Sequence, residues 1–383
     1  MIIIIASFLF ISLLILLFWI LKKLWSPIRV QFLMRSQGIQ GPTYKFLHGN
    51  TKEIVEMRKD SITKSMNHLS HDIFPRILPH VFSWKNVYGA NFLYCYGLQP
   101  ELVVTEPQLL KEILSNRNNN FPKIDLEGFS KKLLGDGVSS SKGEKWTKMR
   151  ILANHVFHGE SLKSMVPMMI MSCETMLEKW KMHEEKEIEV FEEFRILTSE
   201  IISRTAFGSS YLEGKNIFQM LMKLALLVSR NAHKIRFPGI KMNMIIEESL
   251  RLYPPVPFIK RKVNKKVQLG KLTLPPQMQL YISPLAVQHD PKIWGEDVHI
   301  FKPERFAEGV VKATNNNPVA FLPFGYGPRT CLGLNFAMIE SKVTLSMILQ
   351  RYMFTVSPSY VHSPVQLFML RPQHGVKIIL HKI

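Results

Sequence analysis

The sequence predicts a mainly α-helical protein with small β-sheets, preceded by one N-terminal transmembrane helix. Three features support this: a long apolar run at the N-terminus, several stretches with apolar residues at helical spacing, and short alternating runs beside glycine or proline. Hydrophobic residues make up 46% of the 383 positions and charged residues 21%, which is typical of a globular chain and excludes a disordered one.

The first element is an apolar run from Ile2 to Leu21, which only two serines interrupt. As a helix it would span roughly 30 Å, the thickness of one bilayer core. A cleaved signal peptide is the alternative, but no basic region precedes the run and no small-residue cleavage site follows it. Because Lys22 and Lys23 come directly afterwards, we expect a single-pass anchor over residues 1–23 and a cytosolic body.

Residues 24–45 are expected to form a hinge, since they contain Pro27 and a Gln-Gly-Ile-Gln-Gly-Pro string. Residues 46–383 form the predicted folded domain. Within it, helices are expected after Pro107 and over Glu144–Met182 (with a new helix beginning at Pro167), Val190–Thr205, Phe218–Val228 and Met242–Leu252, and strands within Asn91–Val104, Val267–Ser283 and Leu367–Ile383.

The charge balance favours a negatively charged partner. The chain carries 49 basic and 30 acidic residues, a net charge of +19, which suits a membrane surface, a nucleic acid or an acidic protein. The basic residues are scattered, without basic–aromatic repeats or zinc-finger spacing, so we expect no nucleic-acid partner. Three cysteines are too few for a disulfide framework, which favours a reducing compartment.

The strongest functional signal is the loop from Phe324 to Gly333, Phe-Gly-Tyr-Gly-Pro-Arg-Thr-Cys-Leu-Gly. Its glycines allow a tight backbone, and N–H groups facing the Cys331 sulfur at a helix N-terminus favour the thiolate. A lone thiolate suits one metal position, such as haem iron, rather than a zinc or iron–sulfur site that needs several ligands. A buried structural cysteine is the alternative.

The whole string resembles the haem-binding loop of the cytochrome P450 family. The resemblance implies that Cys331 ligates the haem iron and that Phe324 packs against the ring. It also implies that Arg329 pairs with a haem propionate. Gly327 and Gly333 are expected to permit the bend and the close approach of the following helix.

A second motif lies upstream. Trp146 and Arg150 stand four apart on one expected helix and resemble the family's Trp-x-x-x-Arg helix, which implies that both hold haem propionates. Taken as spacing alone, the pair would be core plus surface. Arg261 is a further expected propionate partner. His155 and His158 have a metal-like spacing but no third ligand, so we interpret them as ordinary helix residues.

Glu248 and Arg251 form a third motif, three residues apart on the helix before Tyr-Pro-Pro. An exposed ion pair of little energetic value is the alternative. However, Arg305 follows within Phe-Lys-Pro-Glu-Arg-Phe, and two arginines can share one buried carboxylate. The resemblance implies a structural Glu–Arg–Arg clamp under the cysteine loop, with no chemical role.

One family element is missing. The acid–threonine pair that relays protons to oxygen has no counterpart, and the nearest string, residues 172–176, lacks the glycine kink. Only 98 positions separate Arg150 from Glu248, and loop-like sequence at 237–242 runs directly into the helix of Glu248. We therefore expect an internally shortened member, with a deletion near residues 237–242.

The resemblance implies a haem-thiolate monooxygenase of the plant microsomal type, single-pass in the endoplasmic reticulum membrane and in contact with its lipid. It is expected to oxidise a small apolar substrate, hormone- or terpenoid-like, with O₂ and electrons from an NADPH-dependent flavoprotein reductase. Two alternatives stay open. One is a catalytically inactive splice or gene-model remnant, and the other is a haem electron carrier, a class that usually has two protein axial ligands.

Overall fold

The structure is a computed structural model that describes residues 2–64, 66, 69–115, 118–126, 131, 135–207, 242–367 and 369–383. The predicted helix Phe218–Val228 lies outside these residues. So does the predicted join near residues 237–242, except for Met242.

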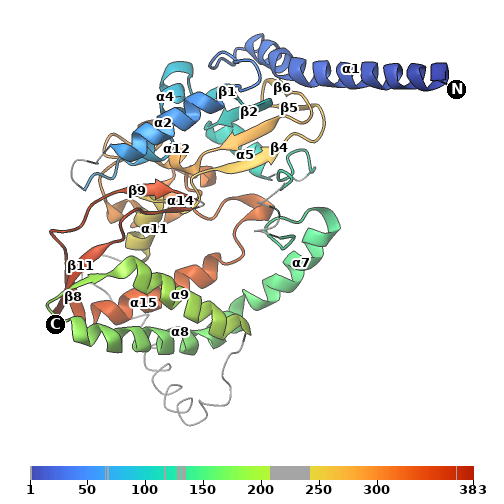
Figure 1. Ribbon diagram of the computed structural model, residues 1–383. Helices are drawn as coiled ribbons and strands as arrows, with labels where there is room; N and C mark the ends of the chain where they lie inside the picture. Colours follow the sequence, from blue (N-terminus) through green and yellow to red (C-terminus); the bar gives the residue numbers. More distant parts are fainter. Residues whose placement is uncertain are drawn as a thin grey trace.

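Helices are the main secondary structure of the described chain, as predicted (Figure 1). The α-helices are α1 (Ile2–Arg35), α2 (Thr51–Thr63), α3 (Phe74–Ile77), α4 (Pro79–Tyr88), α5 (Pro107–Ser115), α7 (Gly143–Val156), α8 (Gly159–Trp180), α9 (Val190–Phe207), α11 (Met242–Leu252), α12 (Pro284–Gln288), α13 (Pro291–Trp294), α14 (Val310–Ala313) and α15 (Leu334–Leu349).

Among the described residues, the strands form four small sheets. The strands are β1 (Asn91–Tyr96), β2 (Gln99–Val104), β3 (Glu187–Glu189), β4 (Ile259–Lys262), β5 (Val267–Leu269), β6 (Leu272–Leu274), β7 (Gln279–Ile282), β8 (Tyr352–Val356), β9 (Pro364–Gln366), β10 (Leu370–Pro372) and β11 (Lys377–Lys382). The largest sheet has the order β1-β2-β7-β4, in which only β2 and β7 run parallel, with Leu102 opposite Leu280.

Two apolar cores flank the cysteine loop. One joins the four-stranded sheet to α5 and includes Leu102, Leu110 and Ile282, all fully buried. The other joins α8, α9 and α15, with Trp180 and Met347 among its members, and these three helices lie together in the lower part of Figure 1. The loop between Phe324 and Gly333 leads from the first core to the second, so both cores hold its ends.

The N-terminal helix α1 reaches out from the folded body (Figure 1) and continues to Arg35, across the first part of the segment 24–45. Over the described residues, no helix combines the length and the hydropathy that a membrane crossing needs.

One detail of the sequence-based prediction is wrong. The new helix begins at Gly159 rather than at Pro167, which lies inside α8. Gly159 has a φ of +48°, so the chain turns there, whereas an interior proline removes only one donor. The strands predicted within Leu367–Ile383 are present as β10 and β11, and they belong to different sheets. β10 pairs with β9, and β11 lies between β8 and β3.

Candidate functional site

The cysteine loop closes on itself. The 3₁₀-helix η4 (Gly327–Arg329) precedes Cys331, whose backbone N–H donates to the carbonyl oxygen of Phe324 at 2.8 Å. The N–H of Thr330 donates to the carbonyl of Gly327 at 3.0 Å, and its hydroxyl donates there at 2.7 Å. These bonds hold the half-buried Phe324 under the loop and leave Cys331 exposed at its tip.

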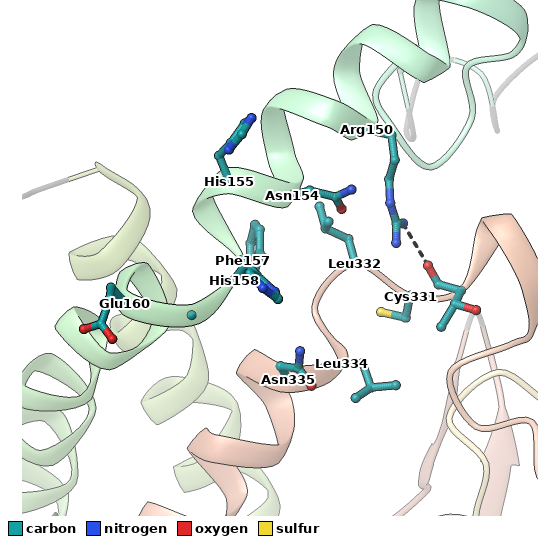
Figure 2. Close-up of a pocket in the computed structure, with 12 residues that line it drawn as sticks. Arg150, Asn154, His155, Phe157, His158, Glu160, Cys331, Leu332, Leu334 and Asn335 are labelled. Carbon is teal, nitrogen blue, oxygen red and sulfur yellow. Dashed lines mark hydrogen bonds between the residues drawn. The ribbon is translucent and has the colours of Figure 1, made fainter.

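Cys331 lies at a cleft of about 710 Å³ between α7 and the start of α15 (Figure 2). Arg150, His155 and His158 line one side, and Leu332 and Asn335 line the other. The volume lies in the range of cofactor and ligand sites, and polar groups converge on an exposed thiol. The cleft can therefore accept a group that bonds to the sulfur.

Gly327 and Gly333 differ in backbone conformation and in the space available for a side chain. Gly327 has a φ of +77°, and a Cβ there would lie 2.4 Å from the carbonyl oxygen of Leu114 at the end of α5. Its lack of a side chain lets the loop pack against that helix. Gly333 has a φ of −83°, and a Cβ there would meet nothing within 4 Å. Packing within the protein therefore explains Gly327, and open space beside the loop leaves room for a ligand at Gly333.

Helix α7 brings Trp146 and Arg150 to the loop, as their spacing predicts. The guanidinium of Arg329 lies over the indole of Trp146, with Cζ 3.8 Å from the ring centroid. Arg329 also donates to the carbonyl of Ser141 at 3.0 Å. Arg150 donates through Nη1 to the carbonyl of Thr330 at 2.8 Å, the dashed line in Figure 2.

Four cations gather behind the loop: Lys123, Arg150, Arg261 and Arg329. Burial, followed by the charges of the three arginines, lowers the pKa of Lys123 to about 8. Burial and the charge of Arg329 lower the pKa of Arg261, which is 5% exposed, to about 10. The pKa of Arg329 is lowered by burial and then by Arg150. Grouped, partly buried like charges cost free energy unless an anion joins them.

In the part of the chain that the structure describes, no carboxylate lies within 4.0 Å of the charged nitrogens of these four side chains; the nearby Asp125 pairs with Lys142 and Lys262 instead. The cation cluster therefore fits a dianionic ligand, which the two propionates of haem provide. The sequence did not indicate Lys123 as a site residue, because the isolated bridge that sets it beside Arg261 joins distant segments.

The predicted clamp is assembled. Glu248 and Arg251 are both 0% exposed. Arg251 donates to both carboxylate oxygens of Glu248, at 2.7 Å from Nε and 2.8 Å from Nη2. Arg305 contacts Glu248 less closely, with Nε 3.5 Å from Oε1, because its Nη2 pairs with Asp297 at 2.6 Å. The alternative of an exposed pair is wrong for Glu248 and Arg251.

Gln288 connects this clamp to the loop, and the sequence alone did not indicate it. Its side chain is fully buried, donates through Nε2 to the carbonyl of Arg251 at 2.8 Å, and accepts at Oε1 from the N–H of Leu322 at 2.8 Å. Leu322 lies two residues before Phe324. A lone glutamine carries no sequence signal, since only the folded chain shows that both ends of its amide are engaged.

The interpretation of both histidines as ordinary helix residues is wrong for His158. It is the N-cap of α8, in the break after α7, and both His155 and His158 line the cleft.

Residues 172–176, the string nearest to an acid–threonine motif, contribute to packing between helices. Cys173 is buried between α8 and α15, and Glu174 pairs with Arg351 at 2.7 Å.

Comparisons with known proteins agree with this geometry. The family described as "Cytochrome P450" matches residues 66–238 and 241–379. Cytochrome P450 CYP749A22 of Panax ginseng is 42% identical over 486 aligned positions, which cover 94% of this chain and 93% of the relative. Cytochrome P450 734A1 of Arabidopsis thaliana is 31% identical, with 94% and 93% covered. Secologanin synthase 1 of Catharanthus roseus is 30% identical, with 94% of each chain covered.

The alignment with the ginseng relative has 486 positions and this chain has 383 residues, so more than a hundred of the positions face gaps in this chain. A solved structure, "Retinoic acid bound cyanobacterial CYP120A1", shares the fold with a TM-score of 0.62 at 18% identity, covering 78% of this chain and 93% of that one. The family's cofactor is haem iron held by a cysteine thiolate. The chain belongs to the cytochrome P450 family of haem-thiolate monooxygenases.

Proposed function

We propose that this protein is a membrane-anchored monooxygenase that inserts oxygen into a small apolar, hormone- or terpenoid-like substrate. Its electrons come from an NADPH-dependent flavoprotein reductase at the endoplasmic reticulum membrane. The observation that carries the haem part of the proposal is the cation cluster, four positive side chains without a carboxylate partner among the described residues, beside an exposed cysteine at a 710 Å³ cleft.

In this proposal the chain's own residues hold and orient the cofactor. Cys331 ligates the iron, Phe324 packs under the ring, and Gly333 leaves it room. Arg329, Arg150 and Trp146 bind the propionates, together with Arg261 and Lys123. When bound, the haem supplies the activation of O₂ for transfer of one oxygen atom to the substrate. Glu248, Arg251 and Arg305 keep the floor of the loop rigid.

The proposed membrane anchor and redox partner are supported by the apolar N-terminal run and by the net charge of the chain. The apolar run Ile2–Leu21 is followed directly by Lys22 and Lys23, and its helix α1 reaches out from the body (Figure 1). This pattern supports an N-terminal anchor with the body in the cytosol. A net charge of +19 supports an acidic redox partner, because opposite charges speed and orient association.

The test of haem ligation is the absorption spectrum of the reduced protein under CO. We expect the red-shifted Soret band of a thiolate ligand, and Cys331→Ser should abolish it. Cys95→Ser is the matched control, since Cys95 is buried in β1 and burial raises the pKa of its thiol to about 12. A thiolate-type band that survives in Cys331→Ser would rule out Cys331 as the ligand.

A second candidate function is favoured by three observations: the gapped alignment, the family match that breaks between residues 238 and 241, and the absence of an acid–threonine motif from the sequence. In this candidate the chain lacks an internal segment near residues 237–242, binds haem and does not turn over. We expect no NADPH-dependent O₂ consumption with reductase present.

The decisive comparison uses a chimera. The segment of the ginseng relative that faces the gap is inserted after residue 238 of this chain. The chimera should gain NADPH- and reductase-dependent O₂ consumption while the parent chain stays inactive. Steady product formation by the parent chain would instead show that it is complete for catalysis, and would leave the monooxygenase as the only candidate.

A further inference from the structure

A cluster of possible metal ligands lies apart from the cysteine loop. Asp72 precedes α3, His289 is the C-cap of α12, and His299 follows α13. One ligand atom from each lies within 4.8 Å of the other two. The cluster therefore joins the segment before α3 to the region after α12, which is far away in the sequence.

His289 has one nitrogen prepared for a ligand. Its Nε2 lies 2.9 Å from the carbonyl oxygen of Leu252, and a carbonyl only accepts, so Nε2 carries the proton. Nδ1 therefore keeps its lone pair, and it is buried without a hydrogen-bond partner in a side chain that is 4% exposed. A histidine that donates one N–H to a backbone carbonyl and presents the other nitrogen is the usual arrangement of a metal ligand.

His299 and Asp72 supply the other two atoms. Nδ1 of His299 is also buried without a hydrogen-bond partner, and it lies 3.7 Å from Oδ1 of Asp72. The rings of His289 and His299 have centroids 5.5 Å apart. Ligand atoms around a tetrahedral zinc ion are about 3.3 Å apart, given bonds of about 2.0–2.1 Å. The three ligand atoms, within 4.8 Å of one another, would have to move closer by up to about 1.5 Å to reach that spacing.

The surroundings admit a cation. The positive charge of Arg251 acts on His289, and this charge is balanced by the bidentate contact of Arg251 with Glu248. His71 is engaged with the hydroxyl of Tyr253 at 2.7 Å. Two imidazole nitrogens and one carboxylate oxygen suit zinc, whereas calcium and magnesium prefer oxygen ligands alone.

We propose that Asp72, His289 and His299 bind one zinc ion, with water in the fourth position, and that the ion ties the segment before α3 to the α12–α13 region. The site is separate from the haem cleft and does not depend on turnover. Because zinc would bind the folded state and not the unfolded chain, it raises the free energy of unfolding by RT ln(1 + [Zn]/Kd), and the unfolding temperature rises with the concentration of free zinc.

The test uses the full chain in detergent, freed of metal with a chelator and dialysed against buffered micromolar zinc. Elemental analysis counts zinc and iron separately, so haem iron does not interfere. We expect one zinc per chain and a higher unfolding temperature. Asp72→Asn and His299→Gln, both at half-exposed positions, should reduce zinc below about a fifth of an equivalent and remove the thermal shift. Circular dichroism confirms that these variants are folded.

His381→Gln is the matched control, since His381 pairs with Glu185 at 2.9 Å and the described residues offer no third ligand there. It should keep the full equivalent. The proposal is overturned if the unsubstituted chain takes up no zinc, or if Asp72→Asn and His299→Gln keep it. It is equally overturned if zinc is lost only in His158→Gln, which would place the ion at the cleft.

Discussion

The guanidinium of Arg329 stacks on the indole of Trp146, with its Cζ 3.8 Å from the ring centroid. This contact joins the cysteine loop to α7, and the bond from Arg150 to the carbonyl of Thr330 joins them a second time. The residues that are expected to bind the propionates are therefore held in position by contacts within the protein, without a bound anion. Such preorganisation lowers the cost of binding.

Trp146→Ala removes this stack and should weaken haem binding. A cation–π contact contributes about 0.5–2 kcal/mol, so the dissociation constant for hemin should rise roughly 2- to 30-fold. Titration with hemin, followed at the Soret band, measures the change. Arg329→Lys should give a similar loss, since an ammonium group lacks the planar fork. The exposed Arg195→Ala is the control; equal affinity in Trp146→Ala and Arg195→Ala would contradict the prediction.

Glu248→Gln should destabilise the fold, because it leaves Arg251 buried without a counter-charge. Removing one partner of a buried pair costs about 3–5 kcal/mol of unfolding free energy. Glu192→Gln is the matched control, since Glu192 and Arg195 have the same spacing on an exposed helix face. Denaturant unfolding should show a large shift of the midpoint for the first variant and none for the second. Similar midpoints would show that burial adds nothing to the clamp.

Lys123 should give the haem-free protein a characteristic pH dependence. Burial and the nearby arginines lower its pKa from 10.5 to about 8, so the folded protein binds this proton less tightly than the unfolded chain does. The free energy of unfolding should therefore rise between about pH 8 and pH 10.5. Lys123→Met should lack this part of the rise. Denaturant midpoints at pH 7.5 and 10 measure it, and parallel profiles for the two proteins would refute the assignment.

Gly327→Ala and Gly333→Ala should separate folding from haem binding. At Gly327 an alanine meets a backbone carbonyl at 2.4 Å with φ at +77°, so the loss of stability should be about 2 kcal/mol or more. At Gly333 φ is −83° and the space is open, so stability should hold while hemin affinity falls. Thermal unfolding and hemin titration check the pair. Unchanged affinity in a folded Gly333→Ala would exclude close contact with the ring.

The family, its fold and its haem cofactor were predicted from the sequence and are confirmed by the comparisons. The spacing of Trp146 and Arg150 and that of Glu248 and Arg251 predicted which side chains share a helix face. Spacing did not predict that Arg305 divides its contacts between Glu248 and Asp297. Nor did it predict that His158 stands outside the helix, since the positive φ of Gly159 appears only in the folded backbone.

Local patterns were sufficient to predict a thiolate ligand and most of the residues expected to hold the haem, because a short loop or one helix turn already places those residue types together. Lys123, Gln288 and His289 are different. Lys123 acquires its lowered pKa from burial and then from arginines on other elements. Gln288 acquires its bridging role from a carbonyl and an amide of separate segments, and His289 its unpaired nitrogen from burial. Only the tertiary structure decides these properties, since they arise where distant segments pack together and exclude water.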